Sequence, residues 1–500
     1  MSTRSIVIIG AGIAGLSAGC YARMNGYATQ IFEAHNQPGG LCTSWRRRSF
    51  TFDGCIHHLA GAGPASKIYT IWDELGVLQR HQMHYFDDLV RVELPDGQGV
   101  TIYTDLDRLE GALKSLAPED GPVIDEYLSA ARRFLGFELL AMPLLTARDV
   151  PGLIGRLPSV LKWGRITLDQ FAERFSNPLL RQAVPTLQYD FANIPVLLHL
   201  SFLAGCADHT LGWPSGGSLA FSRTIAQRYQ DLGGQIEYDS PVARILVERD
   251  RAVGVALDDG AEVRADVVIS AADGHSTIFD LLDGQFADGR IRRYYDAAPD
   301  AIDMSLCVAM GVARDMSAEP HALTLFLEHP VDIVGAPHDR LNVEIFNFDP
   351  ALAPEGKTAI KVLLKSSYSF WKTLSADRIR YAEEKQRIAE TVIAQLESRF
   401  PGLAGQVEVV DVSTPLTIER FSRNWRGLQA WPVPNQSPFS MFGGFTRTLP
   451  NLDCFLMTGQ WAEAMIGIST AAISGRNAIQ TVCRADGRRF RVERPGDAAG

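Results

Sequence analysis

The sequence predicts an α/β protein in which one domain is assembled from three separate stretches of the chain. A buried strand at residues 5–9 leads directly into a glycine-rich turn and a helix. A helix, a strand, a hairpin and another buried strand follow within residues 213–273. A strand, a glycine and a helix come at residues 451–482. Strands that alternate with helices in this way indicate a parallel sheet covered by helices.

The first turn has the spacing of a nucleotide-binding loop. Ser5–Ile9 is an apolar, β-branched run, as expected for a strand covered on both faces. Gly10 permits a tight turn, Gly12 lets the backbone approach a pyrophosphate, and Gly15 lets the next helix pack against the strand. Free N–H groups at the start of that helix favour phosphate. This segment is therefore predicted to be a Rossmann-like dinucleotide site.

The acidic residue after the second predicted strand, Thr29–Phe32, indicates what the loop binds. Glu33 lies 18 residues after Gly15. A carboxylate there accepts hydrogen bonds from a ribose hydroxyl pair and would repel a 2′-phosphate. The sequence thus favours a dinucleotide without that phosphate.

A second glycine pair, Gly39-Gly40, stands shortly beyond the acid. This arrangement resembles the glutathione-reductase-type FAD proteins, in which such a pair lies along the pyrophosphate and ribityl chain. The resemblance favours FAD. Leu41 occupies the position where much of that group has arginine, and three arginines follow at 46–48. They either compensate for that arginine or form a solvated turn.

The segment Asn451–Val482 gives a second signal, because it predicts a strand, Gly459, a loop and a helix from about Ser469. The amino end of such a helix would stabilise negative charge on a flavin as it is reduced. The alternative is an ordinary buried helix in which Gly475 is a packing glycine. The central segment gives a third signal. Its predicted strands are Gln235–Tyr238, Val242–Glu248, Val253–Leu257 and Val267–Ala271.

Together these segments resemble the phytoene-desaturase and retinol-saturase-like family of FAD oxidoreductases, which are relatives of the amine-oxidase fold. The segments that carry the resemblance are Gly10–Gly40, Phe52–Gly61, Pro214–Asp273, Ser413–Phe421 and Asn451–Gly475. The resemblance implies FAD as the cofactor and backbone contact between Val242 and the adenine. The residues expected to bind FAD are Gly10, Ala11, Gly12, Ile13, Ala14, Gly15, Glu33, Ala34, Gly39, Gly40, Leu41, Val242, Ala271, Gly459, Gln460, Gly467, Ile468 and Ser469.

The same pattern predicts three units: a discontinuous FAD-binding domain, a helical lobe and a mixed-sheet domain. Residues 1–80, 213–290 and 431–500 would form the FAD-binding domain. Residues 81–212 would form a helical substrate lobe, which serves as a lid or faces a membrane. Residues 291–430 contain alternating apolar runs and would form a mixed β-sheet over the substrate, followed by a helix at about 376–400 with Ile379 on its buried face.

Composition limits the partners. A net charge of −10 argues against nucleic acid. Seven cysteines without a CxxC pair suit a reducing compartment, and we expect a cytoplasmic protein with no secretory signal. No metal-ligand spacing appears.

The uncharged stretch 191–207 predicts a buried or interfacial helix, and 151–164 mixes apolar and basic residues in a pattern that fits peripheral membrane contact or a lid.

His57 and His58 are the polar pair that we place near the flavin, where a histidine would move a proton or steady the flavin N5 edge. The alternative is that one bonds a backbone carbonyl and the other packs. Glu463 is a weaker candidate, and Lys361 and Lys365 have the pattern of surface lysines.

The predicted function is hydride exchange between flavin N5 and C–C or C=C bonds of an apolar, isoprenoid-like substrate, as a desaturase, saturase or isomerase. With a single dinucleotide fingerprint, the second electron partner would be substrate, oxygen, a quinone or a transiently bound nicotinamide. One alternative is a flavin amine oxidase with an aromatic cage from Trp425, Trp431 and Trp461. The other is a non-catalytic prenyl-lipid escort protein.

Overall fold

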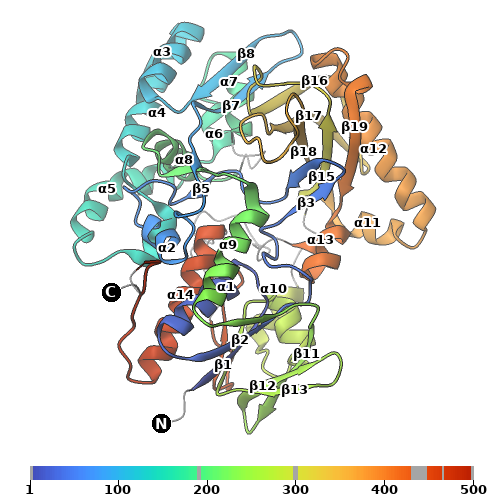
Figure 1. Ribbon diagram of the computed structural model, residues 1–500. Coiled ribbons are helices and arrows are strands. Elements are labelled where there is room, and N and C mark those ends of the chain that lie inside the picture. Colours follow the sequence, from blue (N-terminus) through green and yellow to red (C-terminus); the bar gives the residue numbers. More distant parts are fainter. Residues whose placement is uncertain (1–3, 188–192, 297–301, 429–446, 464–466, 497–500) are drawn as a thin grey trace.

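The structure is a computed structural model that describes residues 4–187, 193–296, 302–428, 447–463 and 467–496. A parallel sheet with its helices forms the lower part of the molecule (Figure 1). A group of helices and a second, larger sheet lie side by side above it. This arrangement confirms the predicted mixed α/β fold with a Rossmann-like domain.

The parallel sheet has five strands in the order β10-β2-β1-β14-β20. Its strands are β1 (Ser5–Ile9), β2 (Ala28–Phe32), β10 (Gln235–Glu237), β14 (Val267–Ser270) and β20 (Phe455–Met457). Every pairing between them is parallel. Strands from the beginning, the middle and the end of the chain therefore form one sheet, as predicted.

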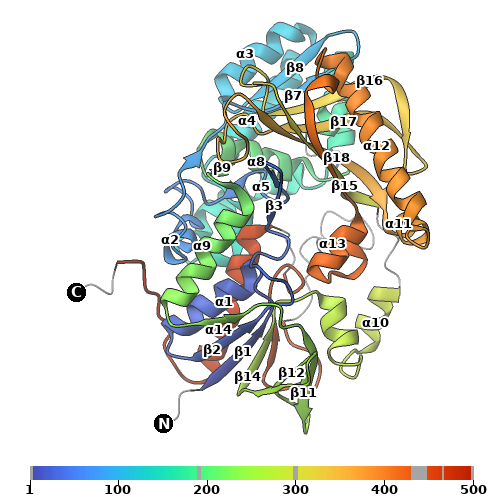
Figure 2. The same ribbon diagram turned by 45° about the vertical axis from the view of Figure 1, so that its right-hand side comes forward.

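Alternate residues of β1 face opposite layers, because side chains alternate across a strand. Ile6 and Ile8 belong to the core formed with helices α1 (Ile13–Met24), α9 (Gly217–Asp231) and α14 (Ile468–Ala485). Val7 and Ile9 belong to a second core formed with the meander of β11 (Val242–Glu248), β12 (Arg251–Leu257) and β13 (Glu262–Arg264). Figure 2 shows the helices on one side of the sheet and the meander on the other. A strand that is buried on both faces explains the uninterrupted apolar run.

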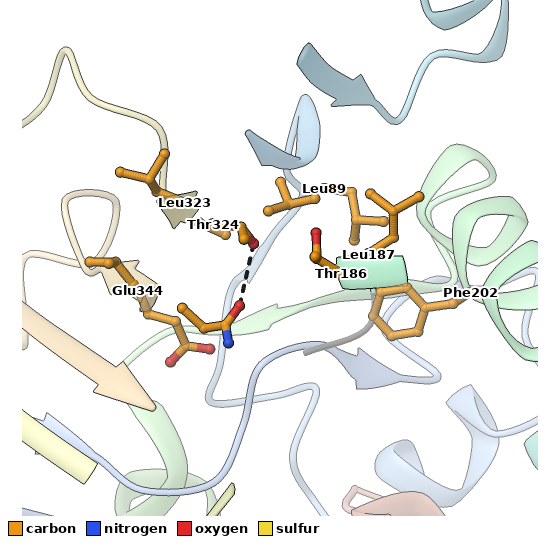
Figure 3. Close-up of a pocket in the computed structure, with 11 residues that line it drawn as sticks. Leu89, Thr186, Leu187, Phe202, Leu323, Thr324 and Glu344 are labelled. Atoms are coloured by element: carbon orange, nitrogen blue, oxygen red, sulfur yellow. Dashed lines mark hydrogen bonds between the residues drawn. The ribbon is translucent and has the colours of Figure 1, made fainter. Parts of the chain in front are cut away.

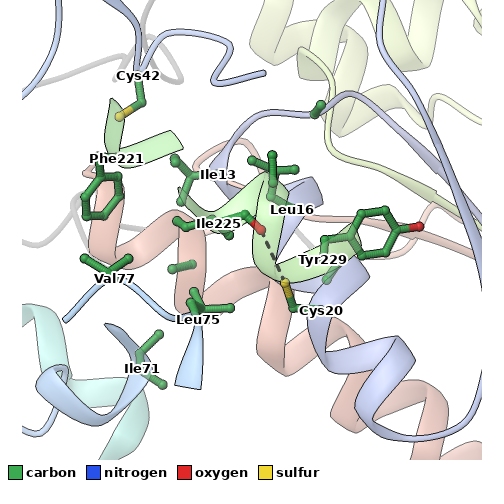
Figure 4. Packing of buried hydrophobic residues seen from close by; sticks show 14 of the residues in the cluster. Ile13, Leu16, Cys20, Cys42, Ile71, Leu75, Val77, Phe221, Ile225 and Tyr229 are labelled. Carbon is green, nitrogen blue, oxygen red and sulfur yellow. Dashed lines mark hydrogen bonds between the residues drawn. The ribbon is translucent and has the colours of Figure 1, made fainter. Parts of the chain in front are cut away.

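The helical layer is closely packed. Leu16 and Cys20 of α1 lie against Ile225 and Tyr229 of α9 (Figure 4), and the Cys20 Sγ lies 3.8 Å from the carbonyl oxygen of Ile225. Burying aliphatic side chains of this size contributes about 1.5–3 kcal/mol each. This layer packs against one face of the strand that leads into the first glycine turn.

Two glycines allow the backbones in this layer to approach each other. A Cβ at Gly15 would lie 2.0 Å from the carbonyl oxygen of Gly10, the residue that directly follows β1, so the helix packs close to the end of this strand. A Cβ at Gly475 would lie 2.3 Å from the carbonyl oxygen of Ala14 and 2.7 Å from the backbone nitrogen of Ala18. Gly475 is therefore the point where α14 crosses α1.

The second sheet has seven strands in the order β19-β15-β18-β17-β16-β7-β8. Its strands are β7 (Asp88–Glu93), β8 (Gly99–Tyr103), β15 (Ile302–Val312), β16 (Ala322–Ile333), β17 (Ala336–Ile345), β18 (Thr358–Ser367) and β19 (Val407–Ser413). Only β16 and β7 pair in parallel, so the sheet is mixed, as predicted. Helix α12 (Arg378–Arg399) buries Ile388, Val392 and Leu396 against it. The expectation for Ile379 is wrong, because this residue in the first turn is 71% exposed.

The helical group is drawn from the segment 81–212 and has a separate core. Its helices are α3 (Leu106–Leu116), α4 (Gly121–Phe134), α5 (Val150–Trp163), α6 (Leu168–Ala172), α7 (Pro178–Ala183) and α8 (Val196–Ala207). The same segment also supplies β7 and β8 to the mixed sheet. Helix α8, predicted as buried or interfacial, is largely buried. In the described ranges, no helix has the length and hydropathy needed to cross a bilayer.

Shorter elements join these parts. They are β3 (Ser44–Arg47), β4 (Phe50–Asp53), β5 (Leu59–Ala60), β6 (Met83–His84), β9 (Leu211–Pro214), α2 (Tyr69–Glu74), α10 (Gly289–Asp296), α11 (Tyr368–Leu374) and α13 (Pro415–Ser422). The predicted domain boundaries stay a prediction.

Candidate functional site

The two glycine loops lie against each other at the carboxyl end of β1. The N–H of Gly39 donates to the carbonyl of Ala11 at 2.9 Å, and Gly12 and Gly39 form a parallel bridge. Gly39 has φ +122°, and a Cβ there would lie 2.3 Å from the carbonyl oxygen of Cys42. A Cβ at Gly12 would meet only the carbonyl oxygen of Gly39, at 3.9 Å. The loops thus leave a backbone surface that a diphosphate fits.

Glu33 stands next to this surface and is 8% exposed. Its carboxylate accepts hydrogen bonds from the N–H of Ala11 at 2.6 Å and of His35 at 2.9 Å. Burial raises the pKa of Glu33, and these backbone donors oppose the rise. The N–H of Ser240 donates to the carbonyl of Glu33 at 2.9 Å, which brings the start of β11 and Val242 close to the acid. The predicted ribose and adenine positions are therefore neighbours.

The remaining predicted cofactor residues follow other strands of the same sheet. Ala271 comes directly after β14, and its N–H donates to the carbonyl of Ile9 at 2.9 Å. Gly459 comes two residues after β20, and a Cβ there would lie 3.3 Å from the Cβ of Ala14. Parallel α/β sheets bind ligands beyond the carboxyl ends of their strands, where the strand order reverses. In this sheet the strand order reverses between β1 and β14. The predicted cofactor residues lie around that point, an arrangement that fits FAD.

Helix α14 begins near the histidine segment. Gly467 precedes its first residue, Ile468, and the Ser469 hydroxyl donates to the carbonyl of Ala60 at 3.0 Å. The first N–H groups of a helix are electropositive and lack partners within the helix. This contact places the amino end of α14 against the segment that carries His57 and His58.

His57 belongs to a buried ionic group that the sequence did not indicate. Its Nδ1 bonds Glu344 of β17, and the Nζ of Lys361 of β18 lies 2.7 Å from the other oxygen of Glu344. Lys361 also donates to the carbonyl of Asp53 at 3.0 Å. The expectation of a surface position is wrong for Lys361, which is 1% exposed. Lys365, four residues on, is half-buried.

The charges in this group stabilise one another. Burial alone would raise the pKa of Glu344, but the nearby His57 and Lys361 outweigh burial and hold it well below its ordinary value. Burial alone would lower the pKa of Lys361, but Glu344 and Asp53 raise it. Both residues are therefore charged at neutral pH, and Glu344 fixes the orientation of the His57 ring.

Asp53 anchors this group to the FAD-binding domain. Its carboxylate accepts from the hydroxyl of Ser44 at 2.9 Å and from the N–H and hydroxyl of Ser218 at 2.5 and 2.7 Å. Ser218 lies in the first turn of α9, where a carboxylate is favoured by the helix dipole. The acid in "FDG" could have been suspected from its place after an apolar strand, but its partners are far away in sequence.

His58 occupies a different environment from its neighbour. Its ring packs edge-on against Phe86 and Phe202, with centroid distances of 5.2 and 4.9 Å. Burial lowers the pKa of His58 to about 3. The two histidines thus separate, one into an ionic group and the other into an aromatic cluster.

A pocket lies between the helical group and the mixed sheet (Figure 3). Thr186, Leu187 and Phe202 contribute from the helical side, and Leu89, Leu323 and Thr324 from the sheet. Glu344 lines the same pocket, so the ionic group reaches its wall. Phe202 connects the pocket to His58. The lining is mainly apolar, and the enclosed space of about 30 Å³ has room for about one water molecule.

The other side chains that the sequence indicated for the site are Glu463 and three tryptophans. The carboxylate of Glu463 is bound by Arg447 at 2.5 Å. Trp425 stacks on His275 with a centroid distance of 4.4 Å, and Trp461 is buried in the core that the meander forms with the parallel sheet. Trp431 lies outside the described residues. Neither Trp425 nor Trp461 is among the residues that line the pocket.

Residues 8–75 match the family model of the NAD(P)-binding Rossmann-like domain. Prolycopene isomerase 2 of an Oncidium hybrid is 26% identical over 93% of this chain and 82% of its own length. All-trans-retinol 13,14-reductase of Danio rerio is 24% identical over 84% and 76%. The lycopene-forming phytoene desaturase of a Paracoccus species is 24% identical over 96% and 97%.

Solved structures show the same fold. An oxidoreductase from Methanosarcina mazei superposes with a TM-score of 0.60 and 18% identity, over 95% of this chain and all of the other. Putrescine oxidase bound to putrescine gives a TM-score of 0.59 at 14% identity, over 97% and 99%. At 18% and 14% identity, these two likenesses show the fold.

Proposed function

We propose, from this chain's homology to FAD-dependent oxidoreductases of isoprenoids, that it binds FAD and changes C–C or C=C bonds of an apolar, isoprenoid-like substrate. The observation that carries the proposal is the apolar pocket whose wall includes Glu344, the partner of His57. FAD, when bound, supplies hydride exchange with carbon. The names of the relatives cover isomerisation, reduction and desaturation.

The chain's residues would divide the work. Gly10, Gly12, Gly39 and the amino end of α1 would hold the diphosphate, and Glu33 would hold a ribose hydroxyl pair. The apolar side chains of the pocket would contact the substrate. His57, oriented by Glu344, would give or take the proton when a C–H bond is made or broken beside the flavin. His58 is too strongly desolvated for that role.

Anaerobic reduction tests the proposal. The purified protein should be yellow, and isoprenoid polyenes or reduced nicotinamide should change the flavin spectrum, whereas amines should not. Glu33→Ala should lower flavin content, while Glu237→Ala, which alters an exposed carboxylate on the neighbouring strand β10, should not. A colourless wild-type protein would favour the escort alternative. Reduction by amines alone would favour the amine oxidase, which rests on fold similarity alone.

Helix α5 supports a second element of the proposal, contact with the surface of a lipid bilayer. Val150, Ile154, Leu157 and Leu161 follow one another at helical spacing and are 47, 63, 46 and 39% exposed. An exposed apolar stripe of this kind inserts into a headgroup region when basic side chains flank it. The basic residues nearby are Arg148, Arg156, Lys162 and Arg165. A peripheral position would suit a substrate that is delivered from lipid.

Sedimentation with vesicles that contain anionic lipid tests this element. A double variant that carries Ile154→Glu and Leu157→Glu should reduce the bound fraction of protein several-fold. Ile379→Glu changes an apolar residue on α12 that is more exposed than either of these, and should leave binding unchanged. Equal loss in both variants, or no vesicle binding by the wild type, would argue against membrane contact.

All seven cysteines are free thiols, which supports a reducing, cytoplasmic location.

A further inference from the structure

Cys42 and Cys55 lie at matching positions on the two chains of the hairpin formed by β3 and β4. The two strands pair in antiparallel fashion. The N–H of Gly54 donates to the carbonyl of Thr43 at 3.0 Å, one step beyond the last pair of that ladder. Cys42 and Cys55 are the next residues outward. Side chains that oppose each other in an antiparallel pair lie at about the separation that a disulfide spans.

Contacts with one residue of α9 hold both cysteines at this place. The Cys42 Sγ lies 3.6 Å from the carbonyl oxygen of Ser218. The N–H of Ile56, the residue after Cys55, donates to the Ser218 hydroxyl at 3.0 Å. The Asp53 carboxylate accepts from the N–H of Cys55 at 3.1 Å. The two segments therefore converge on the first turn of α9, where the thiols of Cys42 and Cys55 hydrogen-bond each other.

The two thiols differ in their access to solvent. Both are free thiols in the structure. Cys42 is 3% exposed, and burial together with the neighbouring Cys55 thiol raises the pKa of Cys42 well above its ordinary value. Cys55 is half-buried. An oxidant from solvent therefore meets Cys55 first, and Cys42 is the adjacent thiol that completes a disulfide.

We propose that Cys42 and Cys55 are a redox-sensitive pair, which hydrogen peroxide converts to a disulfide. The Cys55 thiolate attacks one peroxide oxygen. The S–O bond of a sulfenic acid forms, the O–O bond breaks, and the departing hydroxide takes up the thiol proton to become water. The Cys42 sulfur then attacks the sulfenic sulfur. The S–S bond forms, the S–O bond breaks, and water leaves with the Cys42 proton. The thiols together lose two electrons, which reduce the peroxide to two water molecules.

The disulfide would join two parts of the candidate site. Cys42 belongs to the second glycine loop, because its N–H donates to the carbonyl of Gly39 at 3.0 Å. Cys55 stands two residues before His57. The bond would therefore tie the loop proposed to hold the diphosphate to the segment that carries His57. This modification is independent of the proposed reaction, because it needs neither flavin nor substrate.

Peptide mapping tests the pair. The purified full-length protein is treated with one equivalent of hydrogen peroxide, then alkylated at its remaining thiols and digested without reductant. We expect a pair of peptides joined through Cys42 and Cys55 that has lost two hydrogen atoms, and dithiothreitol should restore both thiols. The oxidised protein should also have a higher Tm than the reduced protein, because the cross-link restricts the unfolded chain.

Cys55→Ser and Cys454→Ser are matched variants, because each replaces a half-buried thiol. The Sγ of Cys454 lies 3.9 Å from Nη2 of Arg4. Cys55→Ser should abolish both the cross-link and the rise in Tm that peroxide causes, whereas Cys454→Ser should retain both. Far-ultraviolet circular dichroism confirms that each variant folds.

Four outcomes would overturn the inference. A sulfinic acid on Cys55 beside an unmodified Cys42 would mean that the two sulfurs do not meet. A wild type whose thiols all remain reduced would mean that peroxide does not reach the pair. A cross-link that persists in Cys55→Ser would belong to other cysteines. An unchanged or lower Tm after the cross-link has formed would contradict the tie between the glycine loop and the histidine segment.

Discussion

Lys361 is the single residue whose removal should cost most in the ionic group. A Lys361→Met substitution removes the ammonium group that lies 2.7 Å from the buried carboxylate of Glu344, and should lower the free energy of unfolding by about 3–5 kcal/mol. Denaturant unfolding measures the change. Adding Glu344→Gln to the variant should restore part of the loss, because the buried carboxylate is then replaced by a neutral amide.

The control is Lys357→Met, just before the same strand. Lys357 pairs with Glu408 at 2.5 Å, and both side chains are 32% exposed. A pair this accessible to solvent contributes about 0–1 kcal/mol. Similar losses for the two lysines would mean that burial of the ionic group is not what makes it important.

Asp273, shortly after β14, gives a pH prediction. Burial raises the pKa of Asp273 from its ordinary value of 3.8 to about 6, although the N–H of Ser276 opposes this. The folded state therefore holds this proton more tightly than the unfolded state. The contribution of the protonated Asp273 carboxyl to the free energy of unfolding is fully present below pH 3.8. It is lost as the pH rises through about 6.

An Asp273→Asn variant should therefore be more stable than the wild type at pH 7, by up to about 3 kcal/mol, and nearly equal to it at pH 4. Its amide oxygen can still accept from Ser276. Thermal unfolding at the two pH values measures the difference. A variant that is no more stable than the wild type at pH 7 would contradict a cost of burying the charged carboxylate.

At the scale of elements, the crossing of α1 and α14 is set by Gly475. A Cβ there would collide with backbone atoms of Ala14 and Ala18, which cannot rotate away. Gly475→Ala should therefore destabilise the protein by about 1–3 kcal/mol and reduce flavin content, because α1 carries the diphosphate turn. Gly111→Ala, in the exposed part of α3 where no atom lies within 4 Å, should stabilise by about 0.5–1 kcal/mol.

The helices and strands themselves were largely predictable. β11 begins and ends where its apolar pattern does, and α12 begins just after Asp377, whose side chain caps its first turn. Ile379 was misassigned because periodicity identifies a helix face but not how far along it the neighbouring sheet extends. Similarly, β7 and β8 join the mixed sheet through a pairing with β16, more than 200 positions away in sequence.

At the scale of the whole molecule, one ligand would connect three distant stretches of chain. FAD that contacts the first turn, the meander and the start of α14 should stabilise all of them at once. Removing FAD should lower the Tm, and restoring it at one hundred times its Kd should raise the Tm by about 3 °C, since it adds about 2.7 kcal/mol. Scanning calorimetry with and without FAD measures this, and an unchanged Tm would mean that FAD does not bind the folded chain.

The sequence by itself determined the dinucleotide turn, its acid and the strands that carry them, because these depend on spacing within a short stretch of chain. It also indicated both histidines. Only the tertiary structure decided that His57 joins Glu344 and Lys361, that His58 faces His321, and that the pocket lies between the helices and the mixed sheet. Those contacts join residues that are far apart along the chain, and local propensity and periodicity carry no information about such distances.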